Sequence, residues 1–494
     1  MIRNWRILLT CLTMVRAMLV GSAPAAERPN IVFILADDLG ATDLGCYGSP
    51  FYETPRIDEL CQSGMKFTRA YAACPVCSPT RASILTGKYP ARVGITDWIP
   101  GNKSDGRLLE TPEDLHDLPL EEVTLAETLA ENGYQNYFVG KWHLGKKISR
   151  PETQGFAESF APGEAKKDDQ DKPDNQKSFL SPALANASVE FINKQTDEKP
   201  FFLYLCFHDP HTPIVEYEDT IEHFKAKAKS LPTNETESQP EHQGKTRLVQ
   251  NNPAYASMVK AMDTAVGRVL DSLKAKGFDD NTIVIFTSDN GGLSTLKKPG
   301  PTSNAPLRAG KGWLYEGGIR VPLIVRAPRM TNSGATFDTP VISTDYYPTL
   351  LQLANIPLKP ERHVDGVSFA TQMHQQSPAD VPARDLFWHY PHYHGSTWTP
   401  GAAIISGRHK LIAFYEPVPE VLEFVRNRVR IGTKGDFVHD QYFVAYEVYD
   451  LDKDPYERNP IEDEQHLDQL SEKLTNWQKS VGAKLPTIRP VPKP

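Results

Sequence analysis

Five short runs of apolar and β-branched residues constrain the fold of this chain more than any other feature of the sequence. They occupy residues 31–35, 137–139, 201–207, 282–287 and 321–325. Segments with the apolar spacing of helices lie between them, for example at 123–131 and 254–274. Continuous apolar strands that alternate with helices are typical of a large, buried, mainly parallel sheet flanked by helices on both faces. We therefore predict an α/β fold and expect its site at the carboxyl ends of the strands, where ligands bind in such sheets.

The pattern changes after about residue 380. Strand-like stretches at 403–405, 410–415 and 442–449 precede a helix with an apolar stripe formed by Leu467, Leu470, Leu474 and Trp477. These features predict a smaller C-terminal subdomain with an antiparallel sheet and a packed helix. A length of 494 residues also favours more than one unit. We divide the chain into a signal peptide at 1–26, a large α/β domain at 27–380 and a C-terminal α+β subdomain at 381–494.

The first 26 residues are interpreted as a signal peptide. Arg3 and Arg6 precede an apolar run, and the small residues at 21–26 suit a signal peptidase. Arg16 interrupts the run, which is shorter than the ~20 residues of a membrane span. We expect an exported protein, periplasmic or secreted, with no stable membrane span. An uncleaved anchor is the alternative.

The charge balance limits the classes of partner. The chain has 54 Lys and Arg against 62 Asp and Glu, a net charge of −8. The protein therefore has no overall positive electrostatic field that would attract nucleic acid. An anionic substrate has to be held by a local group of cations. Two polar inserts, 162–178 and 229–252, are predicted to be mobile surface loops, with lids over a site as the alternative.

Five cysteines follow the predicted signal peptide: Cys46, Cys61, Cys74, Cys77 and Cys206. Export permits disulfides, but an odd number leaves one thiol for another purpose. The Cys-x-x-Cys spacing of Cys74 and Cys77 could indicate a redox or zinc pair. No second pair at the spacing of a zinc site exists in the sequence, which disfavours that interpretation.

Acidic and amide side chains follow two of the predicted strands. Asp37 and Asp38 follow the first run, and Asp289 and Asn290 follow the fourth. Adjacent carboxylates are costly to bury unless a cation neutralises them, and their oxygens suit Ca²⁺ or Mg²⁺. The alternative is that both segments are ordinary turns, since Asp-Asn-Gly-Gly is also good turn chemistry.

A third segment decides between these interpretations. Cys77-Ser78-Pro79-Thr80-Arg81, extended by residues 82–88, resembles the Cys-x-Pro-x-Arg signature of sulfatases, in which the cysteine is oxidised to formylglycine. Residues 140–145, 208–213, 309–311 and 316–322 resemble further segments of that family, in the same order. On these motifs the chain is identified as a member of the type I, formylglycine-dependent sulfatases of the alkaline-phosphatase superfamily.

The resemblance implies a complete set of site residues and cofactors. Cys77 would be the formylglycine, made by a formylglycine-generating or sulfatase-maturating enzyme, and would also contact the metal. Asp37, Asp38, Asp289 and Asn290 would hold one Ca²⁺. Arg81, Lys141 and Lys311 would be the cations around the formylglycine and the sulfate, and His143 and His211 would transfer protons. The hydrated formylglycine would attack sulfur, His211 would protonate the leaving alcohol, and His143 would act as the base that releases sulfate.

The substrate class follows less directly. Export and a family rich in polysaccharide-degrading members favour a sulfated carbohydrate as the substrate. Seven residues outside the motifs are candidates for contacting it, with a packed structural loop as the alternative: Trp98, His389, Tyr390, His392, Tyr393, His394 and Trp398. Two other functions stay open, a phosphomonoester or phosphonate hydrolase of the same superfamily and a non-catalytic protein that binds sulfated glycans.

Overall fold

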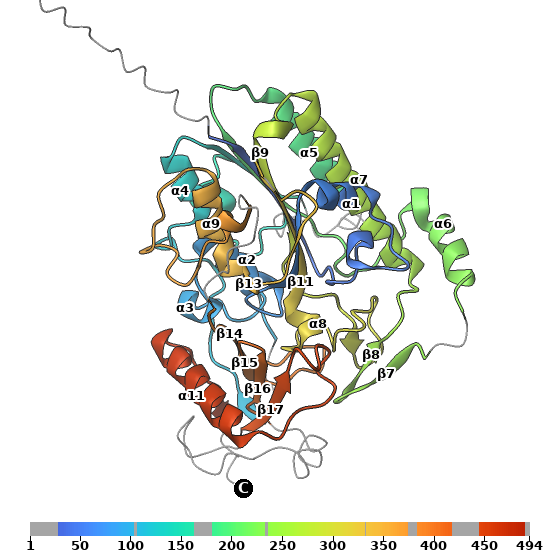
Figure 1. The fold of residues 1–494 in the computed structure, drawn as a ribbon, viewed down its shortest axis with the longest axis vertical. Coiled ribbons are helices and arrows are strands. Elements are labelled where there is room, and N and C mark those ends of the chain that lie inside the picture. The colour runs from blue at the N-terminus through green and yellow to red at the C-terminus, as the bar shows by residue number, and fades with distance from the viewer. Residues whose placement is uncertain are drawn as a thin grey trace, which may run out of the picture.

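The computed structural model describes most of the chain (Figure 1). The described residues are 28–102, 106–162, 180–232, 236–330, 332–373, 383–416 and 444–489. The predicted signal peptide lies outside them, as does nearly all of the first polar insert. Among the helices that are described, none is both long enough and apolar enough to cross a membrane.

The described residues form a nine-stranded sheet in the order β12-β2-β11-β9-β1-β6-β4-β5, with β13 beside β2. Its strands are β1 (Asn30–Ala36), β2 (Met65–Tyr71), β4 (Gln135–Gly140), β5 (Glu158–Phe160), β6 (Phe201–Cys206), β9 (Thr282–Ser288), β11 (Arg320–Arg326), β12 (Thr336–Phe337) and β13 (Val341–Ile342). Strands β9, β1, β6, β4 and β5 run parallel, whereas β11 is antiparallel to both β9 and β2. The predicted, mainly parallel sheet is therefore confirmed.

Helices cover both faces of this sheet, as Figure 1 shows. One face packs against α1 (Pro55–Ser63), α5 (Ser181–Lys194) and α7 (Pro253–Ala275) through residues such as Ile57, Leu184 and Val259. The other face packs against α2 (Cys77–Thr86), α4 (Leu125–Glu131) and α9 (Tyr346–Leu353) through Leu85, Leu129 and Leu350. Every residue of β1 is buried, which explains why its sequence is a continuous apolar run rather than an alternating one.

The second polar insert is more ordered than predicted. After α6 (Glu218–Lys229), strands β7 (Ser238–Glu241) and β8 (Gly244–Arg247) form a hairpin that pairs with β10 (Thr295–Leu296). The prediction of a mobile surface loop over 229–252 is therefore wrong for this hairpin. Its polar side chains are used in buried pairing, because Glu241 is buried and accepts a hydrogen bond from Arg308 Nη2 at 2.8 Å.

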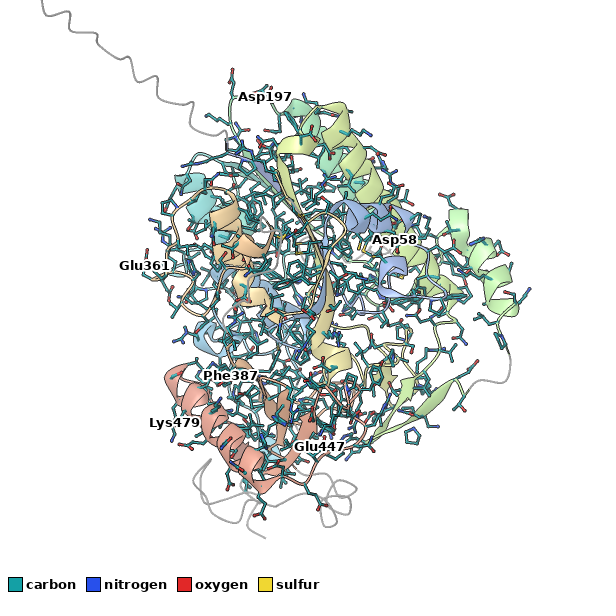
Figure 2. The ribbon with its side chains drawn as sticks, viewed as in Figure 1. Asp58, Asp197, Glu361, Phe387, Glu447 and Lys479 are labelled. Atoms are coloured by element: carbon teal, nitrogen blue, oxygen red, sulfur yellow. The ribbon has the colours of Figure 1, made fainter. Side chains whose placement is uncertain are left out.

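The C-terminal part contains the predicted antiparallel sheet and helix. Its strands are β14 (Leu386–Tyr390), β15 (Gly401–Ser406), β16 (His409–Phe414) and β17 (Ala445–Asp450), and its helix is α11 (Glu464–Ser480). Strand β14 was not predicted, and it places His389 and Tyr390 in a strand rather than in a loop. The Phe387 ring of β14 stacks on Trp477 of α11, with ring centroids 4.8 Å apart; Figure 2 labels Phe387 beside that helix.

Four further elements complete the described fold. They are the short helices α3 (Pro90–Val93) and α8 (Glu316–Ile319), and a strand pair of β3 (Leu109–Glu110) with β18 (Thr487–Ile488). The expected domain boundary, 380–381, falls outside the described residues and stays a prediction.

The C-terminal sheet shares a core with the large sheet's flanking segments. Trp313 and Ile319 pack in one apolar cluster with Trp388 and Ile412. A buried ion network joins the same two parts. Lys410 of β16 is fully buried and lies 3.0 Å from a carboxylate oxygen of Glu316 in α8. The two parts are therefore held in one arrangement by apolar packing and by buried charge.

Candidate active site

The polar side chains singled out by the sequence gather at the carboxyl ends of four adjacent parallel strands. Asp37 and Asp38 follow β1, and Asp289 and Asn290 follow β9. The segment from Lys141 to His143 follows β4, and residues 208–211 follow β6. In space these strands are neighbours in the order β9-β1-β6-β4. The topology therefore converts four distant segments of sequence into one site.

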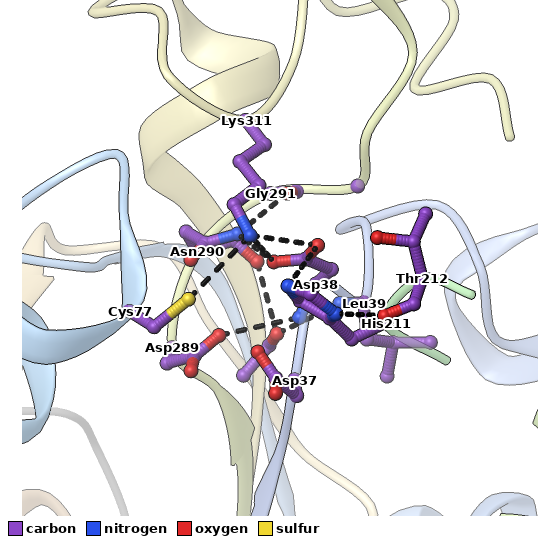
Figure 3. A network of polar contacts seen from close by, with 12 residues as sticks. Asp37, Asp38, Leu39, Cys77, His211, Thr212, Asp289, Asn290, Gly291 and Lys311 are labelled. Carbon is purple, nitrogen blue, oxygen red and sulfur yellow. Dashed lines mark hydrogen bonds and ion pairs between the residues drawn. The ribbon is translucent and has the colours of Figure 1, made fainter. Parts of the chain in front are cut away.

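The carboxylates of this site are buried and cross-linked by hydrogen bonds (Figure 3). Asp289 Oδ1 accepts a hydrogen bond from the backbone N–H of Asp38 at 3.2 Å, and Asn290 Nδ2 donates to Asp38 Oδ1 at 2.8 Å. Asp38 has a φ of 63°, a left-handed conformation that few non-glycine residues adopt. The backbone turn at the end of β1 thus directs Asp38 toward the β9 residues.

Three cations face these carboxylates, of which Arg81 and Lys311 are buried and Lys141 is partly buried. Arg81 of α2 donates from Nε and Nη2 to Asp289 Oδ2 at 2.9 and 2.7 Å. Lys141 Nζ lies 2.5 Å from Asp37 Oδ2, and Lys311 Nζ lies 2.8 Å from Asp38 Oδ1. The pairs balance one another in formal charge. The guanidinium of Arg81 holds Asp289 in place through two hydrogen bonds.

The cluster has the properties of a cation site. Two buried oxygens, Asp37 Oδ1 and Asn290 Oδ1, have no hydrogen-bond partner among the residues that the structure describes. Burial, followed by the charge of Asp37, raises the pKa of Asp289 to about 7 although Arg81 opposes this shift. Further positive charge would lower that pKa again. Ligand atoms of Asp37, Asp38, Cys77 and His211 lie within 4.8 Å of one another, and the carboxylate oxygens among them suit a hard divalent cation.

Cys77 is the first residue of α2, and only 1% of its surface is exposed. Its Sγ lies 3.5 Å from Lys311 Nζ, as drawn in Figure 3. Burial raises the pKa of the Cys77 thiol to about 12, although Lys141 and Lys311 favour the thiolate. The thiol therefore stays protonated near neutral pH.

His143 is fixed as a neutral base. Its Nε2 lies 2.6 Å from the carbonyl oxygen of Ile99, and because a carbonyl only accepts, Nε2 carries the proton. The neutral ring then has its lone pair on Nδ1. Burial, and then the charges of Lys141 and Arg81, hold the pKa of His143 well below its usual value.

His211 lies beside Asp38. Its Nδ1 is 2.5 Å from the Thr212 carbonyl and must donate to it, so Nε2 is directed to the site, 3.7 Å from Asp38 Oδ2. Burial and then Lys311 lower its pKa. His143 and His211 thus approach the same centre with different nitrogens.

Sequence reasoning missed two contributors to this site. His208 lies in the electrostatic field of Lys141 and Asp37, and its buried Nδ1 has no partner within the described parts of the chain. His208 could have been recognised from the sequence, because it lies in the same short motif as His211. The Ile99 carbonyl could not have been found, because a backbone contact leaves no mark in a side-chain pattern.

The seven candidate substrate residues separate into two groups. Five are structural: His389, Tyr390, His392, Tyr393 and Trp398. His389 Nε2 contacts the Lys484 carbonyl at 2.9 Å, and His392 Nε2 contacts Thr96 Oγ1 at 2.8 Å. Tyr390 donates to Asp97 Oδ1 at 2.8 Å, Tyr393 hydrogen-bonds to Glu416, and Trp398 is buried against Trp313.

His394 and Trp98 form the other group. His394 lies close enough to Lys311, Asp38 and His211 for their charges to act on its pKa. Its Nδ1 accepts a hydrogen bond from the Ser396 backbone N–H at 3.1 Å, so the neutral ring presents Nε2–H as a donor. Trp98 is half-buried and immediately precedes Ile99. Both remain candidates for contacting a substrate.

Gly312 connects His394 to Lys311. The Gly312 φ is +82°, and a Cβ there would lie 2.1 Å from His394 Nδ1 and 2.4 Å from Ser396 Oγ. Trp313 Nε1 also donates to the Ser396 carbonyl at 2.9 Å. The loop that carries His394 is therefore packed directly on the backbone next to Lys311.

Comparison with known proteins gives consistent matches. The family model "Sulfatase" matches residues 29–356, and the model "N-sulphoglucosamine sulphohydrolase, C-terminal" matches residues 309–427. A curated "Sulfatase" of Formosa agariphila is 33% identical over 75% of this chain and 76% of its own length. Human "Arylsulfatase A" is 33% identical over 76% of this chain and 73% of its own.

A solved structure resembles the whole fold. The crystal structure of Ps i-CgsB superposes with a TM-score of 0.68 at 26% identity and covers 92% of both chains. The similarity therefore extends through the C-terminal sheet as well as the large one.

The packing around Gly312 predicts a local loss of stability in Gly312→Ala. Alanine in a left-handed conformation costs about 1–2 kcal/mol of unfolding free energy, and the clash with His394 and Ser396 adds roughly 1–3 kcal/mol. Gly407→Ala is the matched control, because Gly407 also has a positive φ of +59° but a Cβ there would meet no atom of the described residues within 4 Å. Urea unfolding of both variants measures the difference, and equal losses would contradict a packed His394 loop.

Proposed function

The chain belongs to the sulfatase family and is a sulfuric ester hydrolase, and from this we propose that it removes sulfate from a sulfated carbohydrate with a formylglycine at position 77 and one Ca²⁺. The observation that carries the proposal is the position of Cys77. It begins a helix directly beside Lys311 and within 4.8 Å of ligand atoms of Asp37 and Asp38. A nucleophile, a cation site and an anion-binding lysine thus occupy one place.

The protonated state of Cys77 supports its conversion. A thiol with a pKa near 12 is a poor nucleophile at neutral pH, since the thiolate is the reactive form. A hydrated formylglycine offers one hydroxyl for attack on sulfur and a second whose deprotonation releases sulfate. An unmodified cysteine or a serine lacks that second hydroxyl.

Asp37, Asp38, Asp289 and Asn290 would hold the Ca²⁺ with their oxygens, including the two that have no hydrogen-bond partner in the described parts of the chain. When bound, the ion lowers the pKa of a coordinated hydroxyl and polarises sulfate oxygens. The charge count agrees with this assignment. Three carboxylates and three cations already balance, so two further positive charges match the two negative charges of released sulfate.

The remaining side chains have separate tasks. Lys141 and Lys311 would bind the sulfate oxygens, on which negative charge develops during transfer. His211 would protonate the leaving alcohol through Nε2, because the bound anion favours its protonated form. His143, neutral with its lone pair on Nδ1, would take the proton that has to leave before sulfate is released. Its task thus comes after transfer is complete.

Two other functions fit the site less well. A phosphomonoester or phosphonate hydrolase would use a serine or threonine directly, whereas residue 77 is a cysteine within an intact sulfatase signature. A non-catalytic binder of sulfated glycans would not require a metal ligand set and two differently positioned histidines. The proximity of Asp37, Asp38, Cys77 and His211 favours the catalytic proposal over this one.

A carbohydrate substrate is supported by the relatives. Human "N-acetylgalactosamine-6-sulfatase" is 28% identical over 90% of this chain, and Ps i-CgsB has been crystallised with k-i-k-neocarrahexaose. His394 adds a hydrogen-bond donor next to Lys311, where a sugar ring attached to the sulfate would lie. We further propose that the protein is exported, as its first 26 residues suggest, and depends on a formylglycine-generating or sulfatase-maturating enzyme.

The first prediction is that residue 77 of active protein is formylglycine. Peptide mass spectrometry of protein made with a maturating enzyme should show the aldehyde in place of the thiol. Cys77→Ser should lose turnover, because the transferred sulfate cannot be released without a second hydroxyl. Sustained turnover by Cys77→Ser, or full activity of protein containing only the thiol, would contradict the proposed nucleophile.

The second prediction concerns the metal. Calorimetric titration of chelator-treated protein should show one Ca²⁺ per chain, and saturation at about 100 times Kd should stabilise the fold by about 2.7 kcal/mol. Asp38→Asn should remove both effects. Asp271→Asn, which changes an exposed acid outside the site, should bind as the wild type does. Unchanged Ca²⁺ binding in Asp38→Asn would exclude the assigned ligand set.

The third prediction separates the two histidines. His211→Ala should lower kcat/KM for a sugar sulfate by roughly 10²–10⁴, and much less for an activated aryl sulfate that needs no acid. His143→Ala should instead give both substrates the same low kcat, because sulfate release is common to them. His223→Ala, at an exposed histidine, is the control. The roles are reversed if His143→Ala, rather than His211→Ala, discriminates between leaving groups.

The fourth prediction tests the substrate contact. His394→Ala should lower kcat/KM for a sulfated saccharide by roughly 10- to 100-fold, the effect of losing one hydrogen bond, and should spare a small aryl sulfate. His389→Ala, in the neighbouring strand but directed to Lys484, should change neither. If His394→Ala leaves kcat/KM for the sulfated saccharide unchanged, His394 does not contact the substrate and its role is structural.

A further inference from the structure

Cys46 and Cys61 form a pair of thiols outside the candidate active site. Cys46 lies in the 3-10 turn η1 (Gly45–Tyr47), which follows the segment leaving the carboxylates of β1. Cys61 lies in the last turns of α1. Both are thiols in the structure, and they pack in the same apolar cluster beneath the large sheet.

Asp58 brings the two cysteines together. Its Oδ1 accepts a hydrogen bond from the backbone N–H of Cys46 at 2.8 Å, which fixes the turn against α1. Asp58, labelled in Figure 2, precedes Cys61 by three residues and therefore lies on the same face of the helix. The side chain of Cys61 is thus directed to the turn that carries Cys46, and the two thiols lie close enough for each to shift the pKa of the other.

The surroundings make the two sulfurs chemically different. The contact with Cys46 lowers the pKa of Cys61, and the charge of Lys66 acts in the same direction. The same contact raises the pKa of Cys46. Cys61 is therefore the sulfur that loses its proton more readily than Cys46.

We propose that Cys46 and Cys61 form an intramolecular disulfide when the chain meets a disulfide oxidant. Such an oxidant is oxidised glutathione, or a thiol–disulfide oxidoreductase in the compartment to which the chain is exported. The Cys61 thiolate attacks one sulfur of the oxidant's disulfide and expels a thiolate. The Cys46 sulfur then attacks the mixed disulfide at Cys61 and expels the second thiolate. The two thiols of the protein lose two protons and two electrons, and the oxidant's disulfide is reduced to two thiols.

The bond would close a loop of sixteen residues, 46–61, between the metal-ligand turn and α1. This loop includes Thr54, whose Oγ1 receives a hydrogen bond from the backbone N–H of Gly45 at 2.8 Å and donates one to Asp58 at 3.0 Å. The crosslink would therefore secure a segment that already holds its shape by hydrogen bonds. The inference is independent of the reaction proposed for the active site.

Peptide mapping of the full chain tests the bond directly. Reduced protein is exposed to excess oxidised glutathione, alkylated, denatured, alkylated again and digested with trypsin without reductant. The expected product joins the peptide ending at Arg56 to peptide 57–66, and dithiothreitol separates them. Cys74 and Cys206 should carry only alkyl groups. Alkylated Cys46 and Cys61, or a bond from either of them to another cysteine, would overturn the proposal.

Stability provides a second measurement. Reduction should lower the Tm of the oxidised protein by roughly 3 °C, the value expected for a loop of this length in a chain of this size. The double variant Cys46→Ser/Cys61→Ser should melt at the same temperature with and without reductant. If that variant responds to reductant as the wild type does, the stabilising bond lies elsewhere and the assignment is wrong.

Discussion

The pairing of three buried carboxylates with three cations, two of them buried, is the interaction on which this molecule depends. The acids come from the ends of β1 and β9, and the cations come from α2, from the end of β4 and from the loop before α8. Removing one partner of a buried pair leaves an uncompensated charge, which typically costs about 3–5 kcal/mol. Strand order, the position of α2 and the loop carrying Lys311 therefore have to be correct together. The fold creates the site, and the need to pair the charges of the site in turn restricts how the chain can fold.

Much of this arrangement could be predicted because it depends on local patterns. The continuous apolar runs identified β1, β4, β6, β9 and β11, since strands buried on both faces have no room for polar side chains. Parallel strands present their carboxyl ends on one edge, so residues following different runs had to meet. The motif around Cys77 then identified the family. The roles of these residues in the reaction still rest on the proposal.

The unpredicted features depend on contacts between distant segments. Strand β14 contains Trp388 and His389, and its aromatic residues looked like a binding loop because the sequence does not show that Trp388 donates to the Ala72 carbonyl. The hairpin of β7 and β8 looked exposed because Glu241 is charged, and only the structure shows its partner Arg308. A polar side chain is usually exposed, but it can be buried when a second polar group is buried beside it as its partner.

The burial of Cys77 affects whether its proposed modification can take place before or after the chain folds. An enzyme that oxidises a thiol must enclose it, but this thiol exposes 1% of its surface at the start of a helix whose ten residues are all buried. A thiol buried to this extent is out of reach of a second protein once α2 has docked. The conversion proposed for Cys77 would therefore have to precede the docking of α2, and a copy that folds first would stay unconverted. Rapid folding, usually an advantage, would here compete with activation.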